Sequence, residues 1–160
     1  MLARSSESDN RLIFAKESVQ RWLADGKELF RLHREEVGKD KELMALNVDE
    51  GYYLRSEQFG RLIVVTARHR GNLVGYVVWT IAHHPHYKDV FCAQDDAHYL
   101  HPHYRRGMAG YFLLKAAIRA LPPLGVQYCY VREKIGHEHP ALMKRLGLKP
   151  LDVTYAGKVA

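Results

Sequence analysis

Residues 99–121 combine residue types and spacings that could bind an anion. An apolar stretch leads into a turn with the sequence Arg-Arg-Gly-Met-Ala-Gly, residues 105–110, and then into a helical pattern of Leu, Ala and Ile. The two glycines lack Cβ atoms, so a ligand can approach the backbone closely. The first turn of the helix offers N–H groups at the positive end of its dipole, and the two arginines add full charges. The segment therefore predicts a phosphate-binding cradle, although an ordinary strand-to-helix turn with two exposed arginines fits the same pattern.

Two adjacent acids, Asp95 and Asp96, interrupt the apolar residues 89–100, which otherwise predict a buried strand. Strict alternation would place Asp96 and His98 on one face of this strand and Asp95 on the other. Acids in a central strand conflict with β propensity, and such conflicts often mark functional sites. We expect Asp96 to be a general base, with Asp95 taking that role if the register shifts by one. A strand end that opens to water would explain the same residues.

A second polar segment, residues 83–89, contains His83, His84 and His86 and is predicted to be a loop. Grouped imidazoles can bind metal, but no carboxylate or thiolate stands at a supporting spacing, so we expect a substrate-side loop and no metal. Cys92 and Cys129 lie in apolar, strand-like contexts. They are predicted to be buried thiols in a reducing cytoplasm rather than a disulfide.

Hydrophobic periodicity predicts the elements that position these residues. A helical pattern runs from about Asp9 to Leu32, and Asp25-Gly26 is expected to divide it into two helices. His33 and Glu36, on the second of these, are expected on a solvated or half-buried face. The other predicted elements are a helix at 49–58, a hairpin of strands at 61–67 and 73–81, a strand at 89–100, the helix after the basic turn, a strand at 126–131 parallel to the previous strand, a helix at 137–146 and a last strand at 151–159. Because the hairpin strands are apolar on both faces, the sheet should be covered on both sides.

Length and composition predict one soluble globular domain. The chain has 160 residues, of which 47% are hydrophobic, and we expect a domain at 9–160 after a flexible segment at 1–8. No apolar run reaches a membrane-spanning length and no signal-peptide core is visible, so the expected location is cytoplasmic. The net charge is +6, and residues 101–160 hold 10 Lys and Arg against 3 Asp and Glu. This asymmetry fits a polyanionic cofactor and also a nucleic-acid surface.

The basic turn carries a resemblance to a known family. Leu-His-Pro-His-Tyr-Arg-Arg-Gly-Met-Ala-Gly, residues 100–110, resembles the GNAT acetyltransferase signature, in which a strand ends in hydrophobic-x-Pro and leads into Arg/Gln-x-x-Gly-x-Gly/Ala. With Arg105 in the first motif position, Gly110 fills the last, while Met108 stands where glycine is usual. The other register uses Gly107 and Ala109. Residues 73–76 are similar to the family's central hairpin and residues 142–148 to its Leu-Tyr-x-x-Leu-Gly-Phe ending, and the turn resembles those of bacteriophage-type members.

This resemblance implies an α/β (α+β) fold of GNAT acyltransferase type. Its central, mostly antiparallel sheet would have a parallel pair splayed around the cofactor and helices on its flanks. The implied activity is that of an N-acetyltransferase, which moves acetyl from acetyl-CoA to a primary amine of a protein or small molecule by direct attack. The residues implied to bind the cofactor are Tyr99, Leu100, Arg105, Arg106, Gly107, Met108, Ala109 and Gly110. In this fold the helices after the first strand border the acceptor site, which makes Glu35 and Glu36 further candidates there.

The resemblance also raises the question of a general acid for the departing thiolate. Many family members use a tyrosine on the late helix, where this sequence has Met143, whose thioether cannot donate a proton. Either Tyr155 or His137 substitutes, or no acid is needed because a thiol pKa near 8.5 already makes the thiolate a fair leaving group. We favour the second of these.

Two other functions stay open at the level of sequence. A degenerate GNAT fold could bind coenzyme A without catalysis, and the basic C-terminal segment could serve a nucleic-acid-binding module. No recognised nucleic-acid motif is present, so we expect an amine acceptor rather than a nucleic acid, and no membrane partner. A homodimer is compatible with the sequence but is not indicated by any residue pattern.

Overall fold

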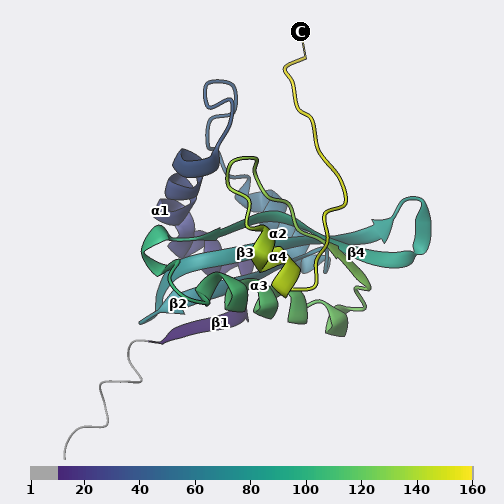
Figure 1. Ribbon diagram of the computed structural model, residues 1–160, viewed down its shortest axis with the longest axis horizontal. Coiled ribbons are helices and arrows are strands. Elements are labelled where there is room, and N and C mark those ends of the chain that lie inside the picture. Colours follow the sequence, from purple (N-terminus) through teal and green to yellow (C-terminus); the bar gives the residue numbers. More distant parts are fainter. Residues whose placement is uncertain (1–10, 160) are drawn as a thin grey trace, which may run out of the picture.

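The computed structural model describes residues 11–159, arranged as a twisted sheet with helices on both faces (Figure 1). The segment 1–8, predicted to be flexible, lies outside the described residues. The strands follow the chain in the order β1 (Leu12–Glu17), β2 (Leu62–His69), β3 (Asn72–His84), β4 (Tyr87–Leu100) and β5 (Tyr128–Tyr130). Neighbours from β1 to β4 are antiparallel, and β4 and β5 are parallel. This is the predicted mixed sheet.

The two faces of the sheet carry different helices. α1 (Val19–Val37) packs on one face through Trp22, Leu23 and Phe30, and α2 (Glu50–Gln58) lies beside it. α3 (Ala109–Arg119) covers the opposite face through Leu113, Leu114 and Ala117. The short helix α4 (Pro140–Arg145) follows β5. Because both faces are covered, β2 and the middle of β3 are buried almost throughout, as their continuous apolar sequences predicted.

The prediction that residues 9–32 form helices is wrong for residues 12–17 and right from Val19 onward, where α1 begins. Residues 12–17 form β1, which pairs with β2 and places Leu12 and Phe14 against the core on the α3 side. Ser18 then caps α1, its side chain accepting a hydrogen bond from the Arg21 backbone N–H. Pairing with the edge of β2 satisfies the backbone of this segment and outweighs its helical periodicity.

The predicted break at Asp25-Gly26 is also wrong, because α1 runs through it without interruption. A Cβ built on Gly26 would lie 2.2 Å from Cζ of Phe30. The glycine therefore gives the Phe30 ring room to pack within the helix and does not form a turn.

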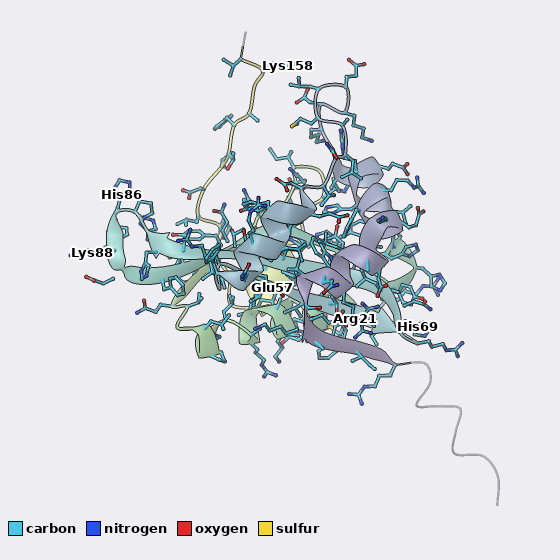
Figure 2. The ribbon with its side chains drawn as sticks, turned by 180° about the vertical axis from the view of Figure 1, so that it is seen from behind. Arg21, Glu57, His69, His86, Lys88 and Lys158 are labelled. Carbon is cyan, nitrogen blue, oxygen red and sulfur yellow. The ribbon has the colours of Figure 1, made fainter. Side chains whose placement is uncertain are left out.

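Residues 83–89 form a strand end, a tight turn and a strand start, not the predicted loop. β3 runs to His84 and β4 begins at Tyr87, so the histidines belong to a projecting hairpin. Figure 2 shows His86 and Lys88 at its tip. The antiparallel pairing of the two strands satisfies the backbone here, which the polar composition did not indicate.

The predicted last strand, 151–159, is wrong as well. This segment is extended but pairs with no strand among residues 11–159, and Figure 1 shows the C-terminal trace running away from the sheet. The alternating Val153 and Tyr155 are 68% and 91% exposed. Alternation alone does not make a strand, because a strand needs a partner for its backbone groups.

The remaining elements agree with the sequence. The hairpin of β2 and β3 turns at Arg70 and Gly71, both with positive φ, as a tight two-residue turn requires. α2 begins after Asp49, whose side chain accepts from the Tyr52 N–H. β4, α3 and β5 form the predicted parallel crossover. Cys92 and Cys129 are free thiols, as predicted, but they are half-buried rather than buried.

Candidate active site

The parallel strands β4 and β5 separate into a fork after a short ladder. They pair only over Cys92–Gln94 and Tyr128–Tyr130. Immediately beyond, Oδ1 of Asp95 accepts a 2.9 Å hydrogen bond from the backbone N–H of Arg132. β4 then continues to Leu100, and no strand among residues 11–159 pairs with this part of its outer edge. The fork thus offers unpaired β4 backbone to an extended ligand.

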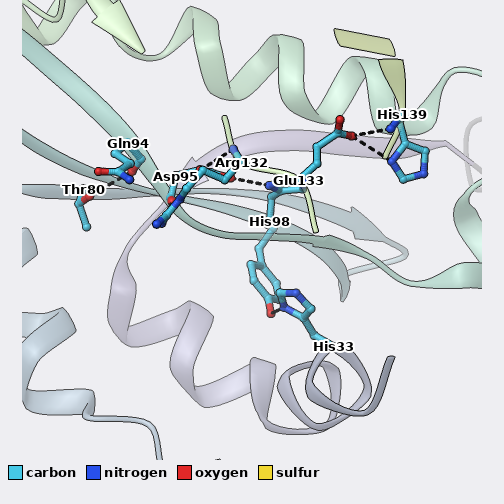
Figure 3. A network of polar contacts seen from close by, with 9 residues as sticks. His33, Thr80, Gln94, Asp95, His98, Arg132, Glu133 and His139 are labelled. Atoms are coloured by element: carbon cyan, nitrogen blue, oxygen red, sulfur yellow. Dashed lines mark hydrogen bonds and ion pairs between the residues drawn. The ribbon is translucent and has the colours of Figure 1, made fainter. Parts of the chain in front are cut away.

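A β-bulge in β4 determines which side chains face the fork. Val78 is opposite Ala97, but Trp79 is opposite Asp95, so Asp96 is an extra residue in the ladder. Beyond the bulge the alternation is shifted, and the predicted grouping of Asp96 with His98 is wrong. Asp95 and His98 come together instead, with 2.7 Å between Oδ2 and Nδ1, and Figure 3 shows the pair beside Arg132.

The two acids proposed as bases lie in different environments. Asp95 is 3% exposed, and its carboxylate contacts His98 and Arg132. Asp96 is exposed and accepts a 2.6 Å hydrogen bond from the Tyr53 hydroxyl of α2. Burial, together with this hydrogen bond to Asp96, raises the pKa of Tyr53 well above its ordinary value. Asp96 is therefore accessible to a ligand, whereas Asp95 is enclosed.

The glycine turn leads from the end of β4 into α3. A one-turn helix, Pro102–Tyr104, precedes it, and Gly107 has φ of +62°, a conformation that favours glycine. Outside its neighbours and its own helix, a Cβ on Gly110 would meet one atom within 4 Å, Leu142 Cδ2 at 3.9 Å. The first turn of α3 contains no acidic residue. Its N–H groups and the space beside Gly110 suit an anion, with Gly110 as the closest point of approach.

Arg105 is held by an ion pair with Glu36 at the end of α1. Its guanidinium donates to both carboxylate oxygens, at 2.5 and 2.8 Å, and its Nε donates to the Leu100 carbonyl at 2.7 Å. It also lies over the Tyr99 ring, whose hydroxyl donates to Glu36. Arg105 thus ties α1 to the strand end and the turn, while Arg106 is exposed. Sequence reasoning had no signal for this long-range pair.

Glu36 and His33 carry shifted pKa values for different reasons. The hydrogen bonds from Arg105 are the main reason that the pKa of Glu36 is lowered to about 2. Burial lowers the pKa of His33 to about 4, and nearby His98 adds to the effect. The His33 ring stacks on Tyr99 at 4.7 Å between centroids. Of the two predicted environments, half-buried is the correct one for both residues, because α1 packs on the sheet here.

Replacing Glu36 with Gln should destabilise the protein in a pH-dependent way. The folded-state pKa of Glu36 lies below its ordinary value of 4.5, so the charged form contributes stability above about pH 4.5, and the contribution is lost as pH falls toward 2. We expect a loss of about 1 kcal/mol at pH 7, since the pair is partly screened by water. Urea unfolding of both proteins at pH 7, 5 and 3 measures the difference. A difference that stayed constant down to pH 3 would exclude this ionisation as its cause.

A basic pocket adjoins the turn on the outer side of α3. It has a volume of about 220 Å³, and its lining residues are Tyr111, Lys115, Ile118, Arg119, Arg145 and Leu146. Nζ of Lys115 donates to the Tyr111 hydroxyl at 2.9 Å, which is the main reason that the pKa of Tyr111 is lowered. The spacing of Tyr111, Lys115 and Arg119 at every fourth residue was a visible sequence signal for this surface. Three cations around one pocket make it a second candidate site for phosphate.

A larger open pocket lies where the histidine hairpin meets β5. It has a volume of about 400 Å³, and its lining includes Thr80, His83, His84, Gln94 and Tyr130. Gln94 is two residues before Asp96, so the pocket begins close to the fork. Within residues 11–159, no three His, Cys, Asp or Glu side chains are grouped to hold a metal ion. The polar lining is suited to hydrogen bonding with a substrate.

The structure separates the residues considered as general acids. Tyr155 is on the exposed C-terminal segment, and His137 is half-buried in the loop before α4. Met143 of α4, which cannot donate a proton, is packed against the core on the α3 side. No helix in the described part of the chain is long and apolar enough to cross a membrane.

Comparison with known proteins identifies the protein family to which a chain with this fork and turn belongs. A model of the acetyltransferase (GNAT) family matches residues 20–147, most of the 160-residue chain. The chain therefore belongs to the GNAT acetyltransferase family and has its mixed-sheet fold. A search of curated protein sequences found no match.

Solved structures with this fold cover nearly the whole chain at low sequence identity. A ribosomal-protein-alanine N-acetyltransferase from Brucella melitensis biovar Abortus 2308 has TM-score 0.68 and 16% identity, covering 94% of this chain and 100% of the other. An aminoglycoside acetyltransferase from an uncultured soil metagenomic sample, in complex with sisomicin, has TM-score 0.69 and 13% identity, with 93% and 97% covered. A predicted acetyltransferase from Clostridium acetobutylicum, with acetyl-CoA, has TM-score 0.69 and 11% identity, with 92% and 96% covered. At these identities the likeness shows a shared fold.

Proposed function

We propose that this protein transfers the acetyl group of acetyl-CoA to a primary amine. The observation that carries the proposal is the alignment of the fork, the free edge of β4 and the glycine turn. From Asp95 to Leu100, β4 advances roughly 16 Å at about 3.3 Å per residue. A ligand with its anionic end at the turn and an extended arm along β4 would therefore bring its far end to Asp95 and Asp96. Family membership and a neighbour solved with acetyl-CoA support this choice of ligand.

The turn and the neighbouring basic pocket would hold the phosphate groups. Backbone N–H groups from Gly107 to Gly110 would bind the pyrophosphate, with Arg106 adding charge, while Tyr99 and Leu100 would offer β4 backbone to the pantetheine arm. We assign Arg105 to the same site as the residue that fixes the turn through Glu36. Met108 and Ala109 complete the cradle through their backbone.

The acceptor would bind on the α2 side of the sheet and present its amine in the opening between β4 and β5. Asp96 is exposed there and would attract an ammonium group, and the pocket with His83, His84 and Gln94 would hold the rest of the acceptor. The related structures include enzymes named for a ribosomal protein and for aminoglycosides, so a protein and a small molecule both remain acceptor classes. We also propose the bacteriophage-type affiliation, a single domain at 9–160 and a cytoplasmic location, and we leave open a homodimer.

Replacing Gly110 with Trp should weaken acetyl-CoA binding at least tenfold without unfolding the protein. The space beside Gly110 is open, so the indole fits the free protein but occupies the cradle. We expect the Kd, measured by calorimetry, to rise at least tenfold, which corresponds to about 1.4 kcal/mol. Gly157→Trp, at an open position on the C-terminal segment, is the matched control. Unchanged affinity in a folded Gly110→Trp protein would remove the phosphate assignment.

The same measurements separate the alternative functions. A protein that binds acetyl-CoA but acetylates no amine would be a degenerate member of the family. Binding of single-stranded DNA in place of acetyl-CoA, with a strong dependence on salt, would indicate the nucleic-acid module.

Replacing Tyr155 with Phe should change turnover by less than about threefold, well below the usual contribution of a general acid or base. Tyr155 is 91% exposed, so its hydroxyl lies in solvent. Steady-state turnover under saturating acetyl-CoA tests this expectation, with Tyr128→Phe, another exposed tyrosine, as the control. A hundredfold loss in a folded Tyr155→Phe protein would make Tyr155 the acid.

A further inference from the structure

The bulge in β4 builds a carboxylate–imidazole pair that strict alternation could not form. Asp95 is opposite Trp79 and His98 is opposite Val77, and both of these partners belong to the core on the α3 side. Asp95 and His98 are three residues apart, so only the extra residue, Asp96, allows them to share a face. The pair is thus a consequence of the irregularity in the strand.

The hydrogen bonds of Asp95 select one tautomer of His98. The carboxylate accepts from the Arg132 backbone N–H at Oδ1 and contacts His98 Nδ1 at Oδ2. A carboxylate can only accept hydrogen bonds, so Nδ1 carries the proton and Nε2 keeps its lone pair. Burial of Asp95 holds this arrangement in place, since its side chain is 3% exposed.

A ligand at the fork can also reach His98. Its side chain is 26% exposed, whereas Asp95 is enclosed. The other carboxylate near this point, Glu133, accepts from the backbone N–H of His139 at 2.8 Å and contacts its Nδ1 at 3.2 Å, as Figure 3 shows. Asp96 faces α2 and accepts from Tyr53. Nε2 of His98 is therefore a free acceptor atom on the α3 side of the fork.

We propose that His98 is the general base of the acetyl transfer and that Asp95 is its positioning residue, an inference that rests on the proposed function. The amine nitrogen bonds to the thioester carbonyl carbon while its proton passes to Nε2. The C–S bond then breaks, and the imidazolium returns the proton to the departing thiolate. The products are an amide and coenzyme A with a free thiol. His98 thus accepts the proton from the amine and later donates it to the thiolate. A proton donor at the position of Met143 is therefore not required.

Histidine tautomers in the free protein provide the first test. In protein labelled with ¹⁵N-histidine, NMR should show His98 with a protonated Nδ1 and an unprotonated Nε2. Asp95→Asn should shift this equilibrium, because an amide can also donate to Nδ1. A dominant Nε2–H tautomer of His98 in the unmodified protein would overturn the proposal, whatever the acetylation assay shows.

Kinetics provide the second test, with acetyl-CoA and three acceptors: spermidine, a lysine peptide blocked at its N-terminus, and kanamycin. His98→Gln should lower kcat by a hundredfold or more and change the KM for acetyl-CoA less than threefold. Added imidazole should restore part of the activity of His98→Ala. His86→Gln, at the hairpin tip, is the matched control. Asp96→Asn should act mainly on the KM for the amine.

The outcomes separate this inference from the proposed function. If the unmodified protein acetylates none of the three acceptors, the proposed function fails for them and the assignment of a base fails with it. If the unmodified protein is active and His98→Gln retains full kcat, only the inference is overturned. A larger loss in Asp96→Asn than in His98→Gln would transfer the role of base to Asp96.

Discussion

Replacement of Arg68 by methionine is expected to lower the free energy of unfolding by about 3–5 kcal/mol, because it leaves the buried carboxylate of Glu17 without the guanidinium that pairs with it. Arg68 is 6% exposed and donates to both oxygens of Glu17, at 2.7 and 2.8 Å. It also pairs with Asp25 of α1 at 2.8 Å and donates to the Gly71 carbonyl at 2.7 Å. One guanidinium thus joins β1, α1 and the hairpin turn.

The pH dependence and a double variant identify the cause of this loss. The hydrogen bonds from Arg68 are the main reason that the pKa of Glu17 is lowered from 4.5, so the stabilising charge is present above that value and is lost as pH falls below it. The effect of Arg68→Met should therefore shrink in acid. Urea unfolding at pH 7 and pH 4 measures it. Adding Glu17→Gln should recover part of the loss, and strictly additive effects would contradict a coupled pair.

Replacement of Trp79 by alanine should cost a similar amount, about 3–5 kcal/mol, through the cavity that it creates. Trp79 has 0% exposed surface and belongs to the core between β3 and α3. Its Nε1–H donates to the Ala117 carbonyl of α3 at 3.1 Å. The side chain therefore fixes the helix that begins at the glycine turn.

Trp79→Phe is the matched control, since it keeps an aromatic ring and removes the hydrogen bond. We expect it to cost about 1–2 kcal/mol, measured by urea unfolding followed by circular dichroism. Because Trp79 is opposite Asp95, the alanine variant should also disturb the tautomer of His98. Equal losses in the two variants would show that the hydrogen bond, and not packing, dominates.

Local sequence determined those parts of the fold whose backbone hydrogen bonds and apolar contacts join residues close together in the chain. The runs at 62–69 and 72–84 are apolar and β-branched around a turn with positive φ, so the hairpin of β2 and β3 could be predicted. The turn at 105–110 and the amphipathic α3 could be predicted for the same reason, and the crossover rule then made β5 parallel to β4. Asp95 and Asp96 were singled out because acids are unexpected in a central strand.

Tertiary structure decided everything that depends on a distant partner. Residues 12–17 became a strand because the edge of β2 was available, and 151–159 did not because no edge received them. Arg105 turned to Glu36 of α1, although the two residues are 69 positions apart in the sequence. The bulge at Asp96 moved His98 to the face of Asp95, which no periodicity could show. The partner strand of β1, the ion-pair partner of Arg105 and the strand opposite the bulge all belong to other elements, and local patterns carry no information about them.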